Sequence, residues 1–139
     1  CSSDLNRQEV QQVFDEVYQA LEEEGTFIFD VHSTYKIDSV FPEYSYHYQT
    51  EEFAFLWDSY AGEKEHSIEH FLTFFVKEQE TDEYFVRYDE LHQERTYSLD
   101  NYLRMLESAG FMNVKVYADF TDEAPTETSE RWFFVCQRD

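Results

Sequence analysis

The sequence predicts an α/β protein that carries a separate antiparallel β-sheet in the middle of the chain. Two segments with helical spacing, near residues 7–23 and 99–109, each precede a run of β-branched and aromatic residues. Between residues 44 and 97 apolar and polar residues alternate with a period of two, which is typical of antiparallel strands. The length of 139 residues suits one domain with a single core.

The first helix, expected over residues 7–23, is predicted by one apolar face made of Val10, Val13, Phe14, Val17, Tyr18 and Leu21. Asn6 and Glu9 have the spacing of a capping box at its start. Gly25 is expected to end the helix in a left-handed conformation. The continuous apolar run in Thr26–Val31 then predicts a strand that is buried on both faces.

The middle segment, residues 44–97, predicts a meander of three or four strands. Aromatic residues alternate with others in its first part, at Tyr44, Tyr46, Tyr48, Phe53, Phe55 and Trp57. A longer strand follows, in which one face carries His66, Ile68, His70, Leu72, Phe74 and Val76. The last strand is expected near residues 83–97, after a polar break.

The last part of the chain predicts a second helix and two strands. Ser98 is the expected N-cap of a helix over residues 99–109, and Gly110 is its expected end. The apolar stripe of this helix consists of Leu99, Tyr102, Leu103 and Leu106. The strands are expected at Phe111–Phe120 and in the buried run Arg131–Cys136, with a polar loop between them.

The composition excludes several classes of protein. Ten Lys and Arg against 31 Asp and Glu give a formal net charge of −21, which disfavours nucleic acids and membrane surfaces as partners. No apolar run approaches the ~20 residues of a membrane-spanning helix, so we expect a cytoplasmic protein. The three glycines, Gly25, Gly62 and Gly110, lie too far apart for the clustered-glycine loops that bind nucleotide phosphates.

His32 and Tyr35 are the polar residues best placed for function, because they follow the predicted strand Thr26–Val31 directly. In open α/β sheets, ligands bind in the crevice outside the carboxyl ends of the strands. The alternative is that His32 only satisfies hydrogen bonds of the loop backbone.

Several histidines raise the question of a metal site. His66 and His70 share one face of a strand but lie ~13 Å apart on it, which is too far for one ion. Either residue, together with His47 or His92 and a carboxylate, would make a site with two histidines and one acid. The same histidines also suit a half-buried sheet without a metal, and we therefore expect none.

The segment 88–97 concentrates titratable side chains in one predicted strand. Alternation places His92 and Glu94 on one face and Arg95 and Tyr97 on the other. This pattern fits a strand that lines a polar pocket, and equally a solvated face with cross-strand charge pairs. No serine or cysteine stands in the context of a catalytic nucleophile, so hydrolytic chemistry has no support.

Four segments resemble, in their order along the chain, the C-terminal half of small bacterial class I S-adenosylmethionine-dependent methyltransferases. The segments are Gly25–Lys36, Gln93–Tyr97, Ser108–Phe111 and Glu127–Arg131. The likeness covers most of residues 8–136. It implies a partial Rossmann-like sheet with flanking helices and an antiparallel β-meander insertion.

The resemblance also implies how the chain is divided. The equivalents of the family's strands 5, 6 and 7 would be Thr26–Val31, Phe111–Phe120 and Arg131–Gln137, the last two forming an antiparallel hairpin. Residues 1–43 and 98–139 would belong to the methyltransferase core. Residues 44–97 would be the insertion that covers the substrate.

The cofactor implied by the resemblance is S-adenosylmethionine, but nothing in the chain matches the glycine-rich turn and the acid with which the family binds it. We therefore expect a fragment or separated domain that is inactive alone, while the complete parent protein binds the cofactor. Ser3, Leu5 and Asn6 are the candidate cofactor-binding residues, since Cys1–Asn6 loosely resembles the end of the family's fourth strand.

The implied reaction is an in-line displacement that carries a methyl group to an unidentified small-molecule or protein acceptor, mainly through alignment of the two reactants. His32 or His92 would accept a proton from the acceptor. Tyr35 and Tyr60 would shape the pocket. Arg95 would hold an acidic substrate.

A function of another class is also compatible with the sequence. The chain would then be a non-catalytic binding module whose acidic, aromatic sheet recognises a protein or a cationic ligand. Tyr46, Tyr48 or Trp57 would supply the cation–π contacts.

The resemblance further implies a consequence for assembly. Without the fourth strand, one edge of Thr26–Val31 would expose unpaired backbone groups, and such an edge recruits another strand. We therefore expect a homodimer or a strand-exchanged assembly.

Overall fold

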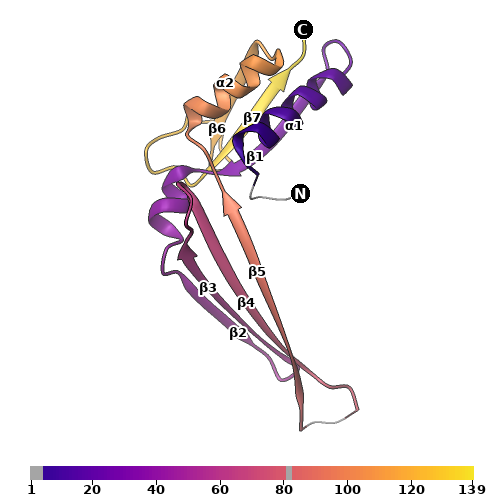
Figure 1. The fold of residues 1–139 in the computed structure, drawn as a ribbon, viewed down its shortest axis with the longest axis vertical. Coiled ribbons are helices and arrows are strands. Elements are labelled where there is room, and N and C mark those ends of the chain that lie inside the picture. Colours follow the sequence, from indigo (N-terminus) through magenta and orange to yellow (C-terminus); the bar gives the residue numbers. More distant parts are fainter. Residues whose placement is uncertain (1–4, 81–82) are drawn as a thin grey trace.

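The structure is a computed structural model that describes residues 5–80 and 83–139, and it contains two separate sheets (Figure 1). The first, which we call the core sheet, has the order β1-β7-β6, with β1 at Thr26–His32, β6 at Asn113–Ala118 and β7 at Arg131–Gln137. The second, which we call the blade, has the order β2-β3-β4-β5, with β2 at Ser45–Gln49, β3 at Phe53–Ala61, β4 at Ser67–Lys77 and β5 at Phe85–Arg95. In Figure 1 the blade projects away from the core sheet and its helices.

The two predicted helices are present, and local signals fix both of their starts. Helix α1 spans Arg7–Ala20, and its Asn6 side chain accepts from the Glu9 backbone N–H in a capping box. Helix α2 spans Leu99–Ala109, and Ser98 caps it by accepting from the Asn101 N–H. Gly110 ends α2 with a φ of 120°, as predicted.

The end of α1 differs from the prediction. The helix stops at Ala20, and its C-cap Leu21 is extended. The residue with positive φ is Glu24 rather than Gly25, so the prediction of a left-handed glycine was wrong. Gly25 is instead a point of close approach, because a Cβ there would lie 2.8 Å from the Glu22 carbonyl oxygen.

Strand β1 is not buried on both faces, which corrects a second prediction. Phe27 and Phe29 pack against the core, whereas Ile28 points away from it and is 64% exposed. Strand β1 also pairs with β7 on one side only within the described chain. The apolar run of β1 therefore predicts burial of both faces of the strand, whereas the described residues cover only one.

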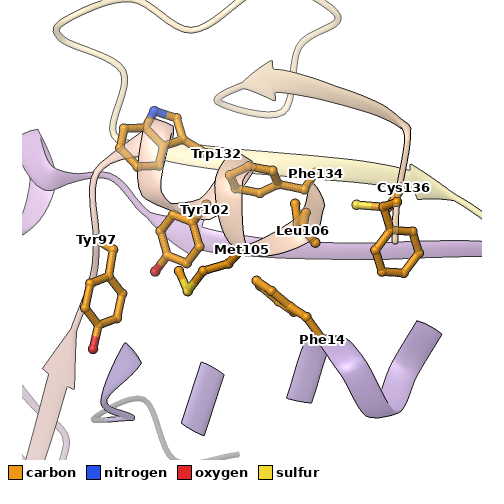
Figure 2. Packing of buried hydrophobic residues seen from close by; sticks show 9 residues of the cluster. Phe14, Tyr97, Tyr102, Met105, Leu106, Trp132, Phe134 and Cys136 are labelled. Carbon is orange, nitrogen blue, oxygen red and sulfur yellow. The ribbon is translucent and has the colours of Figure 1, made fainter. Parts of the chain in front are cut away.

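The core lies between the core sheet and the two helices. Figure 2 shows how Tyr102 and Leu106 of α2 face Phe134 of β7, with Phe14 of α1 on the other side. Leu106 and Phe134 are fully buried. The ring of Phe29 stacks on Phe134 with centroids 4.7 Å apart, so β1 and β7 are joined by side chains as well as by backbone pairing.

The blade confirms the prediction of a separate antiparallel sheet in residues 44–97. All three of its strand pairs are antiparallel, and its four strands fit the predicted meander. His66 does not belong to β4 as predicted, because it precedes the strand with a φ of 55°. A short π-helix that the sequence analysis did not predict, η1 at Lys36–Val40, follows β1 and covers the base of the blade through Ile37.

No helix in the described part of the chain has both the length and the apolar character that a membrane crossing requires.

Candidate functional site

A cleft of about 410 Å³ lies between α1, β1 and the end of β5. Its walls are apolar side chains of the first helix and strand, namely Val10, Val13, Phe14, Val17, Phe27, Phe29 and Val31. One end is polar and is lined by Asp30, His32, Glu94, Arg95 and Thr96. This polar end lies at the carboxyl end of β1, where the blade joins the core sheet.

Glu94 connects the two sheets at the polar end of the cleft. One carboxylate oxygen accepts from Nδ1–H of His32, at the end of β1. The other oxygen accepts from Nε2–H of His70 in β4, at 3.3 Å. The Glu94 side chain is largely buried, so its charge depends on these two donors for compensation.

Each histidine has a second partner that fixes its tautomer. Arg131 Nη2 donates to Nε2 of His32 at 2.8 Å, which leaves the imidazole proton on Nδ1, facing Glu94. Nδ1 of His70 lies 2.7 Å from Ser59 Oγ and 3.0 Å from the Trp57 indole nitrogen. Both imidazoles therefore present an N–H group to the same carboxylate.

The series of contacts continues through the Arg131 guanidinium, whose Nη1 donates to Asp30 at 2.5 Å. Five polar side chains thus form one network from the core sheet to strand β4 of the blade, in the order Asp30, Arg131, His32, Glu94 and His70.

The pKa of Glu94 reports the strength of this network. Burial alone raises the pKa of the carboxyl group, because it disfavours the charged form. Hydrogen bonds from His32 and His70, and their charges when protonated, outweigh burial and lower the pKa to about 2. Glu94 is therefore a carboxylate at neutral pH.

Arg95 supplies a positive charge to the cleft. Its guanidinium lies 5.1 Å from the centre of the Tyr97 ring, and it forms no ion pair with a carboxylate in the described part of the chain. Its Nε is buried without a hydrogen-bond partner among the same residues. The chain has 31 acidic residues, yet the Arg95 guanidinium is paired with none of those that the structure describes.

Thr96 holds the polar end in place. Its hydroxyl donates to the His32 carbonyl oxygen at 2.7 Å and lies 3.1 Å from the Tyr102 hydroxyl in α2. The end of β5 is thereby fixed against both β1 and α2.

The predicted site residues are only partly brought together. His32 and Arg95 line the cleft. His92 lies exposed on β5 and pairs with Glu90 at 2.9 Å. Tyr60 lies exposed on β3 against Phe71, and neither residue lines the cleft.

Of the remaining predicted residues, those that the structure describes lie at the starts of helices. Tyr35 is the N-cap of η1 and does not line the cleft. Leu5 lines the cleft, whereas the Asn6 side chain is engaged in the capping box. Ser3 lies outside the described residues.

No group of three or more metal-binding side chains with suitable geometry occurs in residues 5–80 and 83–139. His32, His70 and Glu94 are two histidines and one acid, but their nitrogens donate to the carboxylate rather than converge on a common point. The sequence analysis paired His70 with His47 or His92 and so missed Glu94 as its partner. The only feature of the sequence that pointed to Glu94 as a site residue was its predicted position on the same strand face as His92.

Comparison with known proteins finds relatives that are named as methyltransferases. The chain is 46% identical over 134 residues, or 96% of its length, to a protein of Geobacillus sp. (strain WCH70) that bears the name "Putative methyltransferase". It is 39% identical to YqeM of Bacillus subtilis (strain 168), which bears the same description. The chain spans about half of these relatives, 53% and 56% of their lengths. No family model matches it.

Solved structures agree on the fold. The chain aligns over 99% of its length with an S-adenosylmethionine-dependent methyltransferase from Clostridium acetobutylicum, with a TM-score of 0.83 and 22% identity, and covers 54% of that chain. The CcbJ methyltransferase from Streptomyces caelestis aligns with a TM-score of 0.75 and 14% identity, and 56% of it is covered.

The fold is therefore that of S-adenosylmethionine-dependent methyltransferases. The chain aligns with about half of each of these proteins, which confirms the resemblance to methyltransferases found in the sequence.

Proposed function

We propose that the chain is the C-terminal, substrate-side half of a class I methyltransferase and is inactive by itself. The main support for this proposal is the 46% identity, over 96% of the chain, to a relative that is named as a methyltransferase. The chain spans about half of that relative. In this proposal β1, β6 and β7 are the equivalents of the family's strands 5, 6 and 7. The antiparallel pairing of β7 with both neighbours supports the assignment.

The proposed division keeps residues 1–43 and 98–139 as parts of the core and residues 44–97 as the substrate-covering insertion. The separation of the core sheet from the blade supports this division. The free edge of β1 would then be the place of a parallel strand from the other half of the protein.

In this proposal the chain does not bind S-adenosylmethionine by itself. Of the candidate cofactor residues, Leu5 faces the cleft, but the Asn6 side chain is already occupied. The apolar walls of the cleft offer neither a glycine-rich turn nor a strand-end acid of the kind the family uses. The bound cofactor would supply an electrophilic methyl group, and its site would lie mainly in the other half.

The chain's own contribution would be to bind and orient the methyl acceptor at the polar end of the cleft. Arg95 lines the cleft and would bind an anionic group of the acceptor through its guanidinium. For His32 to accept a proton, the acceptor would have to displace the Arg131 N–H from Nε2. Glu94 would stabilise the resulting imidazolium, because it already accepts from Nδ1–H.

Assembly follows from the same proposal. In the isolated chain the unpaired edge of β1 and the exposed Ile28 would favour a homodimer or strand exchange, opposed by repulsion from the net charge of −21.

Hydrogen exchange tests the proposed missing neighbour of β1. The chain is compared with a fusion in which it is joined to the part of the Geobacillus relative that it does not span. We expect the amides of β1 that face away from β7 to exchange slowly in the fusion and rapidly in the dilute isolated chain. Equal exchange in a folded fusion would contradict the proposal.

A further inference from the structure

His70 is a buried polar residue on the inner strand β4 of the blade, where it is only 8% exposed. Its ring packs edge-on against Phe41, with centroids 4.9 Å apart, and against Trp57, with centroids 5.5 Å apart. An imidazole in such aromatic surroundings has little access to water, so both of its nitrogens need hydrogen-bond partners within the protein. These partners indicate the role of the residue.

One nitrogen of His70 is satisfied inside the blade. Nδ1 lies 2.7 Å from Ser59 Oγ and 3.0 Å from Trp57 Nε1. Trp57 Nε1 also donates to Ser59 Oγ at 2.8 Å, so these two side chains keep a hydrogen bond that does not depend on His70. Packing within the blade therefore accounts for Nδ1 but not for Nε2.

The other nitrogen of His70 contacts Glu94 at the polar end of the cleft. Nε2–H donates to Oε2 at 3.3 Å, while Oε1 accepts from Nδ1–H of His32. The 3.3 Å distance is longer than usual, but the charge of the carboxylate strengthens the interaction. A glutamate has several rotatable side-chain bonds, and one donor alone would leave its carboxylate free to turn. Two donors on different oxygens, one from β4 and one from the end of β1, fix its orientation.

The orientation of Glu94 matters for His32, which lines the cleft. The carboxylate keeps the proton of the neutral His32 ring on Nδ1, so Nε2 is the nitrogen that can take up another proton. The opposite tautomer would place an unprotonated Nδ1 against the carboxylate and an N–H group against the donor of Arg131. A carboxylate that has turned away would no longer enforce this preference.

From these contacts we propose that His70 is a positioning residue of the methyl-acceptor site. It holds the Glu94 carboxylate in the orientation that keeps the His32 proton on Nδ1, and it thereby keeps Nε2 in the form that accepts a proton from the methyl acceptor. This inference rests on the proposed function, in which His32 accepts that proton. His70 itself does not line the cleft, so it acts through Glu94 and not on the reactants.

The proposal couples the blade to the core. Strand β4 lies in one sheet and β1 in the other, and Glu94 is hydrogen-bonded to a histidine from each. The position of β4 relative to β1 therefore determines whether both oxygens of Glu94 keep their donors. The blade would thus set the protonation geometry of the site as well as cover the substrate.

Substitutions at position 70 separate the contributions of the two nitrogens. The side-chain amide of glutamine extends about as far as Nε2, whereas the amide of asparagine extends only about as far as Nδ1. His70→Gln should therefore retain a donor for Glu94, and His70→Asn and His70→Phe should remove it. His92→Phe is the matched control, because His92 lies opposite His70 in the strand register but is exposed and pairs with Glu90.

Nitrogen NMR of the imidazole side chains at neutral pH measures the tautomer of His32 and the exchange of its Nδ1 proton in the 139-residue chain. We expect this proton on Nδ1 in the wild type, in His70→Gln and in His92→Phe, with exchange rates within about twofold of one another. In His70→Phe and His70→Asn the proton should exchange at least about tenfold faster. Circular dichroism checks that every variant is folded.

The proposal would be overturned by equal exchange of the His32 proton in the wild type and in folded His70→Phe or His70→Asn. It would also be overturned if His70→Gln or His92→Phe accelerated exchange as much as His70→Phe, because general loosening of the blade would then explain the effect. Neither result bears on the proposed function, which the hydrogen-exchange comparison of β1 tests without any change at position 70. Failure of that comparison would refute the proposed function and leave the contact between His70, Glu94 and His32 in place.

Discussion

Removal of the Glu94 carboxylate should destabilise the protein more than removal of any exposed acid on the blade. The pKa of Glu94 falls from its ordinary 4.5 to about 2 on folding. At about 1.4 kcal/mol per pKa unit, ionised Glu94 contributes about 3 kcal/mol to the free energy of unfolding. Glu94→Ala should remove most of this and leave the N–H groups of His32 and His70 without their acceptor.

The sign of the pH dependence follows from the lowered pKa. A carboxyl group whose pKa is depressed on folding stabilises the protein fully above its unfolded value, 4.5, and loses that contribution as the pH falls through its folded value, about 2. The wild type should therefore lose stability between about pH 5 and pH 2. Glu94→Ala should show a shallower loss over the same range.

Urea unfolding at a single low protein concentration, followed by Trp fluorescence and far-UV circular dichroism, measures both effects. Glu94→Gln keeps one acceptor oxygen and should cost about half as much as alanine. Glu90→Ala is the matched control, because Glu90 pairs with an exposed histidine on the same strand, and it should change stability by no more than about 0.5 kcal/mol. Equal effects of Glu94→Ala and Glu90→Ala would refute the role assigned to the network.

Three other substitutions test the core and its helix caps by the same unfolding measurement. Leu106→Ala removes a fully buried side chain of α2 and should cost about 2–5 kcal/mol; a change below about 0.5 kcal/mol would mean that the helix stripe faces solvent. Gly110→Ala places a Cβ 2.7 Å from the Tyr18 ring at a φ of 120°, so it should cost at least about 1 kcal/mol, and a neutral result would contradict the close approach. Ser98→Ala should cost about 1 kcal/mol through loss of the N-cap, and an unchanged midpoint would show that this cap is dispensable.

The features that sequence reasoning predicted well depend on residues close together in the chain. The capping box joins Asn6 to Glu9, and Ser98 and Gly110 enclose α2. Alternation predicted the blade because a solvated antiparallel sheet imposes a period of two over each strand. These signals do not require knowledge of what packs against the element.

Sequence-based prediction was less accurate for burial that depends on residues far away in the chain. The apolar run of β1 indicated burial on both faces, but Ile28 has no cover from the described residues. The pattern of apolar residues indicates which faces of a strand are suited to burial. It does not indicate whether the elements that would cover those faces are present.

The contacts of the candidate site were hard to predict for the same reason. Glu94 joins residues 62 and 24 positions away, a separation that no local pattern encodes. Strand register places His70 directly opposite His92. His70 is buried because it lies on an inner strand against Phe41, whereas His92 lies on the edge strand β5 and is exposed. Spacing alone placed both histidines on suitable faces but did not indicate which of them contacts Glu94.

Calorimetry with S-adenosylhomocysteine tests most directly whether the chain is the substrate-side half of a methyltransferase. The isolated chain and its fusion to the part of the Geobacillus relative that it does not span are titrated under identical conditions. We expect no binding to the isolated chain and saturable one-to-one binding to the fusion. Binding of the same affinity to the isolated chain, or none to a folded fusion, would contradict the account.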